Sequence, residues 1–230
     1  LPKARPFKPW QKPNPGILQS ITRAGKNILF ELDGCAMAVD LSGSKCLRSS
    51  SLPKPSSAGA IRLATLLFTT KRGNESSWAY YAPPSKPPVL VRGSMDQLKK
   101  DLPKHGYDLF GTTPIDWLVR KLHSRNEPLF NLLMRKQFVA AMDSWMLCEA
   151  LHESRVSPLM RSNCITTGEL SDVMGAAKKL ALESLVLPPG LRTMAVYGRE
   201  RCPLCGGPLS RKRSGNRFTV YWCFLCQREK

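Results

Sequence analysis

Acidic residues are scarce in this chain of 230 residues, in which 17 Asp and Glu stand against 35 Lys and Arg. The formal net charge is therefore +18 at pH 7. A field of this sign and size attracts phosphate polyanions at long range. The charge favours nucleic acid as the partner, while a solvated basic surface and attraction to anionic lipid are the alternatives.

Long apolar runs are also lacking. No stretch approaches eighteen consecutive apolar residues, so the sequence predicts a protein that does not cross a membrane. A hydrophobic content of 42% is nevertheless ample for folded cores, in one large or two small domains. No internal repeat is evident.

Regular cysteine spacing is absent from most of the chain. Four of the eight cysteines stand at unrelated spacings, which argues against a disulfide framework and for a reducing compartment such as cytosol, nucleus or organelle matrix. These four are Cys35, Cys46, Cys148 and Cys164.

The first half of the chain predicts an extended arm and a β-rich domain. Residues 1–16 hold five prolines and four basic residues but no acid, which favours an extended basic arm. Residues 17–93 then contain short apolar runs, and the Asp33-Gly34 pair between two of them predicts a β-hairpin. Further strands are expected over 61–70, 76–81 and 89–93, and together they predict a β-sandwich.

Residues 94–190 carry helical signals. Thr113-Pro114 offers a cap and a first turn for one helix. A mostly apolar stretch from Pro128 to Leu151 predicts a second, long helix, either unbroken or interrupted near Asp143. A third is expected from near Thr167, with one apolar face. That face comprises Leu170, Val173, Met174, Ala177, Leu180 and Ala181.

Residues 191–230 hold the strongest pattern in the chain, C-x2-C-x17-C-x2-C. Its cysteines are Cys202, Cys205, Cys223 and Cys226. This spacing lets each Cys-x-x-Cys pair present two thiolates to one tetrahedral Zn²⁺. Four protein ligands leave no open position, so a single structural zinc ion is expected rather than a catalytic one. Binding worth about 10–16 kcal/mol folds a segment too small for its own core.

Basic residues crowd the segment between the two cysteine pairs. Arg211, Lys212, Arg213 and Arg217 surround a Ser-Gly-Asn turn, and the FTVYW segment alternates like a strand. The pattern predicts a zinc-stapled β-hairpin whose guanidinium groups suit phosphate contacts. A solvated turn is the alternative interpretation.

Several motifs resemble the formamidopyrimidine-DNA glycosylase and endonuclease VIII family. The resemblance includes VYGR ending at Arg199, CPLCGGPL, Arg217 and the closing CFLCQ, and it spans roughly residues 17–228. ITRAGKNILFELDG resembles a family strand carrying Lys26, and residues 113–158 resemble its helix–two-turn–helix region. The resemblance implies an α+β fold: a β-sandwich, then a helical domain with a four-cysteine zinc finger. It implies nucleic-acid contacts through Lys26 and Arg217, and we expect Arg199, Arg211, Lys212 and Arg213 to contribute to the same surface.

The segments that carry the family's chemistry differ in this sequence. The family's nucleophile is an N-terminal proline amine followed by glutamate, whereas this sequence begins Leu1-Pro2-Lys3, with the Pro2 nitrogen in an amide bond. The segments that fill the site of an extruded base are represented by Asp40–Lys45 and Ala82–Pro88, and the family's Gly-Asn-Ile-Tyr segment lies near Asp143. We therefore expect no catalytic residue in this chain.

Three functions follow as hypotheses. The first is a non-catalytic RNA-binding subunit of a mitochondrial ribosome, bound to rRNA and neighbouring proteins. The second is an active DNA glycosylase and abasic-site lyase whose Pro-Glu precedes residue 1. The third is a scaffold protein whose helices bind other proteins. The mitochondrial matrix, with the nucleus as alternative, is inferred from composition and from a start at Leu1, which fits a removed targeting peptide or a start further upstream.

The remaining polar residues predict no chemistry. His105, His123 and His152 have no ligand spacing, which favours surface or core packing. Glu149 stands where the family has a glutamate, and it is interpreted as a local hydrogen-bond partner.

Overall fold

The computed structural model divides into two compact units, Leu1–Pro103 and Lys104–Lys230. It describes residues 17–24, 27–40, 46–49, 61–69, 75–82, 89–101, 106–140, 142–186, 194–215 and 218–227. The predicted arm at 1–16, the segments 41–45 and 83–88, Lys26, His105 and Arg217 lie outside these ranges. The two units are considered separately.

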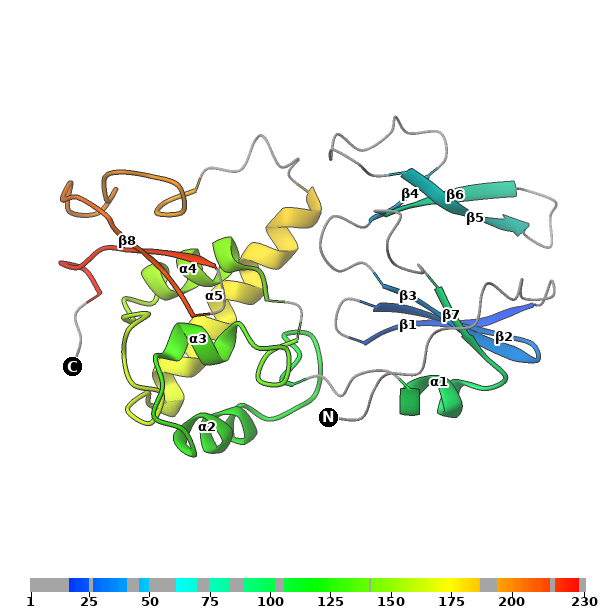
Figure 1. Ribbon diagram of the computed structural model, residues 1–230, viewed down its shortest axis with the longest axis horizontal. Coiled ribbons are helices and arrows are strands. Elements are labelled where there is room, and N and C mark those ends of the chain that lie inside the picture. Colours follow the sequence, from blue (N-terminus) through cyan, green and yellow to red (C-terminus); the bar gives the residue numbers. More distant parts are fainter. Residues whose placement is uncertain are drawn as a thin grey trace. The chain divides into compact units, whose positions relative to one another are not determined.

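The first unit contains two antiparallel sheets (Figure 1). A four-stranded sheet has the order β1-β2-β3-β7, formed by β1 (Leu18–Ala24), β2 (Asn27–Leu32), β3 (Cys35–Asp40) and β7 (Val89–Arg92). A three-stranded sheet has the order β4-β6-β5, formed by β4 (Cys46–Ser49), β6 (Glu75–Ala82) and β5 (Ile61–Thr69). The strands predicted over 61–70, 76–81 and 89–93 are confirmed as β5, β6 and β7.

The predicted hairpin is confirmed as β2 and β3. Leu32 pairs with Cys35 across the Asp33-Gly34 turn. Gly34 has φ +82°, a left-handed conformation that glycine adopts without steric cost. The Asp33-Gly34 pair therefore predicted this turn correctly, because the turn needs a residue with positive φ at position 34.

Helix α1 (Met95–Asp101) covers part of the first sheet. Its Leu98 is fully buried in a small core with Leu29 of β2 and Ala36 and Ala38 of β3. This packing places α1 in the first unit, whereas the sequence assigned residues from 94 onward to the helical half. A helical pattern of seven residues does not reveal which unit the helix packs against. The burial of Leu98 against the first sheet shows it.

The second unit is built around four helices in its described part, α2 (Ile115–His123), α3 (Leu129–Leu133), α4 (Ser144–Glu153) and α5 (Thr167–Val186). They share one large apolar core that includes Leu118, Phe130 and Leu147. The α5 prediction is confirmed: Leu170, Val173, Met174 and Ala177 are buried, and Leu180 and Ala181 pack partly against the core. No helix in the described ranges combines the length and apolarity needed to span a bilayer.

Local signals define where α5 begins. The Thr166 backbone N–H donates to Glu169 Oε2 at 3.0 Å, and the Glu169 N–H donates to Thr166 Oγ1 at 3.2 Å. This reciprocal capping box satisfies two backbone donors of the first turn. The predicted start of α2 differs slightly, since Pro114 is its N-cap and no side-chain hydrogen bond caps it.

An unbroken helix from Pro128 to Leu151 is wrong, and the alternative of an interruption is confirmed. Helix α3 ends at Leu133 and α4 begins only at Ser144. The intervening turns hydrogen-bond to another segment instead: the Tyr107 N–H donates to the Phe138 carbonyl at 2.7 Å, and the Ala140 N–H donates to the Tyr107 carbonyl at 2.8 Å. Phe138 and Ala140 are buried, so the apolar composition here reflects burial rather than helicity.

The C-terminal hairpin is part of this same unit. Strand β8 (Ser210–Arg213) pairs antiparallel with β9 (Thr219–Trp222). Val196, Val220 and Trp222 belong to the apolar core shared by the helices. The predicted hairpin is therefore confirmed, and it is packed on the helical core rather than separated from it at residue 190.

Candidate metal centre and cationic fingertip

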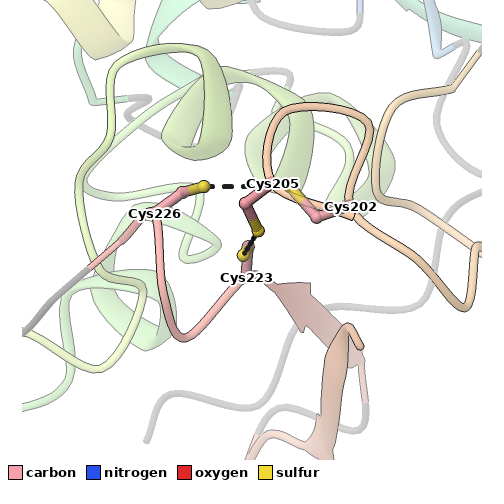
Figure 2. A group of neighbouring side chains, drawn as sticks. All are labelled: Cys202, Cys205, Cys223 and Cys226. Carbon is pink, nitrogen blue, oxygen red and sulfur yellow. Dashed lines mark hydrogen bonds between the residues drawn. The ribbon is translucent and has the colours of Figure 1, made fainter. Parts of the chain in front are cut away.

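The four predicted metal ligands converge. The sulfur atoms of Cys202, Cys205, Cys223 and Cys226 all lie within 4.8 Å of one another (Figure 2). Cys202 Sγ and Cys226 Sγ are 3.8 Å apart, and Cys205 Sγ and Cys223 Sγ are 3.4 Å apart. Four sulfurs at about 2.3 Å from a tetrahedral Zn²⁺ lie about 3.8 Å from each other. The sulfur separations exceed the roughly 2.05 Å of a disulfide bond and fit one structural zinc ion.

Backbone hydrogen bonds close both Cys-x-x-Cys turns, here called the first knuckle (Cys202–Cys205) and the second knuckle (Cys223–Cys226). The Gly206 N–H donates to the Cys202 carbonyl at 2.9 Å, and Gly206 has φ +70°, which favours glycine. The Gln227 N–H donates to the Cys223 carbonyl at 2.9 Å. The ligand pairs are thus held by turns whose geometry the sequence encodes locally.

Helix α4 anchors the segment that leads into the first knuckle. Glu149 is buried, and its carboxylate accepts the backbone N–H groups of Ala195 at 2.8 Å, Val196 at 2.9 Å and Tyr197 at 2.7 Å. Each such hydrogen bond to an ionised acceptor is stronger than a neutral one. Glu149 was predicted to have local partners; its partners instead lie more than forty residues away along the chain.

Two further α4 side chains contact the finger. Cys148 Sγ accepts the backbone N–H of Tyr221, on β9, at 3.4 Å, and burial raises the pKa of this thiol to about 12. His152 Nε2 lies 3.3 Å from Cys202 Sγ, with both residues buried. His152 is therefore not isolated, and its spacing in sequence gave no signal of this contact.

The closing glutamine ties the second knuckle to the helices. Gln227 Oε1 accepts the Cys223 N–H at 2.9 Å, while Gln227 Nε2 donates to the Val156 carbonyl, beyond the end of α4, at 2.8 Å. The residue is only 1% exposed, so water cannot satisfy its amide. These two hydrogen bonds to protein groups do so instead.

The fingertip is strongly cationic. Arg211, Lys212 and Arg213 on β8 are exposed, and with Thr219 and Tyr221 they line a hollow of about 300 Å³. The Ser214 N–H donates to the Phe218 carbonyl at 2.7 Å and narrows the turn. Of the other predicted contacts, Arg199 is exposed and its Nε donates to the Met194 carbonyl at 3.1 Å. Lys26 and Arg217 lie outside the described residues.

Sequence comparison finds a consistent group of relatives. No model of a known protein family matches the chain. The formamidopyrimidine-DNA glycosylase of Geotalea uraniireducens is 31% identical over 144 residues, which are 55% of this chain and 53% of that protein. The protein of the same description from Sphingopyxis alaskensis is 30% identical over 128 residues, 48% of this chain and 47% of that protein. The chain thus spans about half the length of the curated relatives it matches.

Solved structures show the same likeness at the level of the fold. The MutM (Fpg) protein of Thermus thermophilus aligns with a TM-score of 0.69 at 23% identity, covering 93% of this chain and 84% of that one. Lactococcus lactis Fpg, in a complex with DNA containing an abasic site, aligns with a TM-score of 0.69 at 19% identity, covering 92% and 82%. The fold is therefore α+β, with strands first, helices after them and a four-cysteine finger at the end. Part of the chain is therefore similar in sequence to formamidopyrimidine-DNA glycosylases, and its fold is similar to theirs, as its motifs predicted.

Proposed function

We propose that this chain binds nucleic acid through its fingertip, on a DNA-glycosylase scaffold. The observation that carries the proposal is the run of three exposed cations, Arg211, Lys212 and Arg213, on one strand of a hairpin joined to the four-cysteine cluster. Arginine and lysine on a fixed frame suit phosphate oxygens, and Tyr221 supplies an aromatic surface beside them. A structural neighbour, Lactococcus lactis Fpg, has been solved with DNA, which supports this use of the fold.

More specifically, we propose an RNA-binding structural role, in a mitochondrial ribosome, without glycosylase activity. The net charge of +18 and the departures from the family at Asp40–Lys45 and Ala82–Pro88 support this choice. Exposed apolar side chains on the two knuckles, Leu204, Phe224 and Leu225, suit contact with neighbouring proteins of such a particle.

An active DNA glycosylase and abasic-site lyase is the second candidate. The relatives described as formamidopyrimidine-DNA glycosylases favour it. In this case the reactive proline amine would precede Leu1 and attack the anomeric carbon of the damaged nucleotide, while the glycosidic bond breaks and the damaged base leaves.

The fingertip is tested by the salt dependence of binding to labelled RNA and DNA, read by fluorescence anisotropy. Replacing Arg211, Lys212 and Arg213 with glutamine should weaken binding. The slope of log K against log salt is negative, and its magnitude should fall by about 2 to 3. The matched control removes three exposed charges elsewhere, at Lys99, Lys100 and Arg120. An equal effect of both triple variants would remove the fingertip from the proposal.

Substrate choice separates the two candidates. The RNA-binding proposal expects tighter binding to structured single-stranded RNA than to abasic-site duplex DNA, and co-sedimentation of the full-length protein with mitochondrial ribosomal particles. A covalent adduct of the full-length protein with abasic-site DNA, trapped by borohydride, would establish the lyase and overturn the non-catalytic role.

A further inference from the structure

His152 has one close polar contact that involves the metal centre. It lies on α4 one helical turn after Cys148, and its Nε2 is 3.3 Å from the sulfur of Cys202. The two residues are 3% and 2% exposed, so water has little access to either. The contact therefore joins the helical core to a metal ligand inside the protein.

The chemistry of the two atoms determines the direction of this hydrogen bond. A thiolate bound to zinc keeps lone pairs and net negative charge, so it accepts hydrogen bonds, whereas an imidazole N–H donates them. In a site closed to water, such a bond is stronger than it would be at the surface. With zinc bound to the Cys202 thiolate, this contact calls for a proton on His152 Nε2.

Cys202 differs from the other three cysteines of the cluster in the hydrogen bonds that its sulfur accepts. Its sulfur also receives backbone N–H groups from Cys205 and Leu204, the usual donors within a knuckle. His152 adds a third donor, which comes from outside the finger. Cys205, by contrast, is exposed.

We propose that His152 is a positioning residue of the metal centre, whose N–H donates to the Cys202 thiolate, strengthens zinc binding and fixes the first knuckle to α4. Outer partners of metal ligands commonly change metal affinity by about 10- to 100-fold. The proposal depends on the metal centre and not on the proposed function, so failure of nucleic-acid binding would leave it intact.

Zinc affinity of the full-length protein is the first measurement, by competition with a chromophoric chelator. His152→Leu removes the donor at similar volume, and we expect its affinity for zinc to fall by about 10- to 100-fold. His152→Gln places an amide N–H at a similar distance from the backbone and should recover most of this loss. His123→Leu is the matched control, because His123 contacts the Ile165 carbonyl and not the finger.

The cobalt-substituted protein gives a second readout that packing alone would not change. Loss of a hydrogen bond raises the energy of the sulfur lone pairs, so the sulfur-to-cobalt charge-transfer band should move to longer wavelength in His152→Leu. The band should stay near its original position in His152→Gln and His123→Leu. If His152→Leu does not fold, His152→Phe, which keeps a ring without a donor, takes its place.

The proposal is overturned if a folded non-donor variant binds zinc as the unsubstituted protein does, with an unshifted charge-transfer band. It is equally overturned if His152→Gln is folded yet loses as much affinity as the non-donor variant, since the donor would then be irrelevant.

Discussion

The carboxylate of Glu149 accepts the backbone N–H of Tyr197 at 2.7 Å, so the middle of α4 holds the segment that enters the metal centre. The same carboxylate serves Ala195 and Val196. With Cys148 and His152, it gives α4 three separate contacts to the finger. The finger is therefore oriented by the helical core as well as by its metal.

Replacing Glu149 with glutamine tests this anchor. The amide NH₂ would meet a backbone N–H that the carboxylate now accepts, leaving a buried donor unsatisfied, so we expect a loss of about 1–3 kcal/mol in unfolding free energy. Urea denaturation at saturating zinc measures it. Glu153→Gln on the same helix breaks only an exposed pair with Lys179 and should cost much less, because water screens that pair. Equal costs would contradict the anchor.

Removal of the metal should loosen the finger while the helices persist. Cys223→Ser, or zinc chelation, removes the tetrahedral tie that the short hairpin requires. Hydrogen exchange at 210–213 and 219–222 should then rise strongly, with α5 much less affected because it packs mainly against α4 and α2. Cys164→Ser, which changes an exposed cysteine outside the cluster, should leave exchange unaltered. Unchanged hairpin protection after verified metal loss would refute this.

Gly106 should not tolerate a side chain. A Cβ there would lie 2.2 Å from the backbone oxygen of Phe138, so the backbone must move. Gly106→Ala is expected to destabilise the protein by about 1–3 kcal/mol, measured by thermal or urea unfolding. Gly175→Ala, in open space on α5, should instead stabilise it by up to about 1 kcal/mol. The two Gly→Ala substitutions are thus expected to change the free energy of unfolding in opposite directions.

Cysteine reactivity should separate Cys148 from Cys164. Burial raises the pKa of Cys148 from its ordinary 9.0 to about 12, so its thiol stays protonated at pH 8 and should resist iodoacetamide in the folded protein. Exposed Cys164 should be alkylated, as peptide mass spectrometry would show. Because the folded pKa is raised, the stability that Cys148 contributes is complete below pH 9 and declines as the pH rises toward 12. Rapid native labelling of Cys148 at pH 8 would contradict its burial.

Local signals predicted the parts of the fold that depend on local geometry. Asp33-Gly34 specifies a turn, the start of α5 expected near Thr167 coincides with a local capping box of Thr166 and Glu169, and two Cys-x-x-Cys turns bring four sulfurs together. Each of these rests on residues within a few positions of each other, or on a fixed ligand spacing.

The contacts of α4 were beyond sequence reasoning for a physical reason. His152 meets Cys202 across fifty positions, and Gln227 meets the Val156 carbonyl across seventy-one. No period or spacing encodes such pairs, since they depend on how the finger packs on the helices. Between α3 and α4 the sequence left an unbroken and an interrupted helix both open, because buried turns and buried helices share one composition.

The fingertip places Arg211, Lys212 and Arg213 on consecutive residues of one strand, where their like charges repel one another. An anion bound among the three cations would offset this repulsion. Anion binding at the fingertip and the stability of the folded finger should therefore increase together.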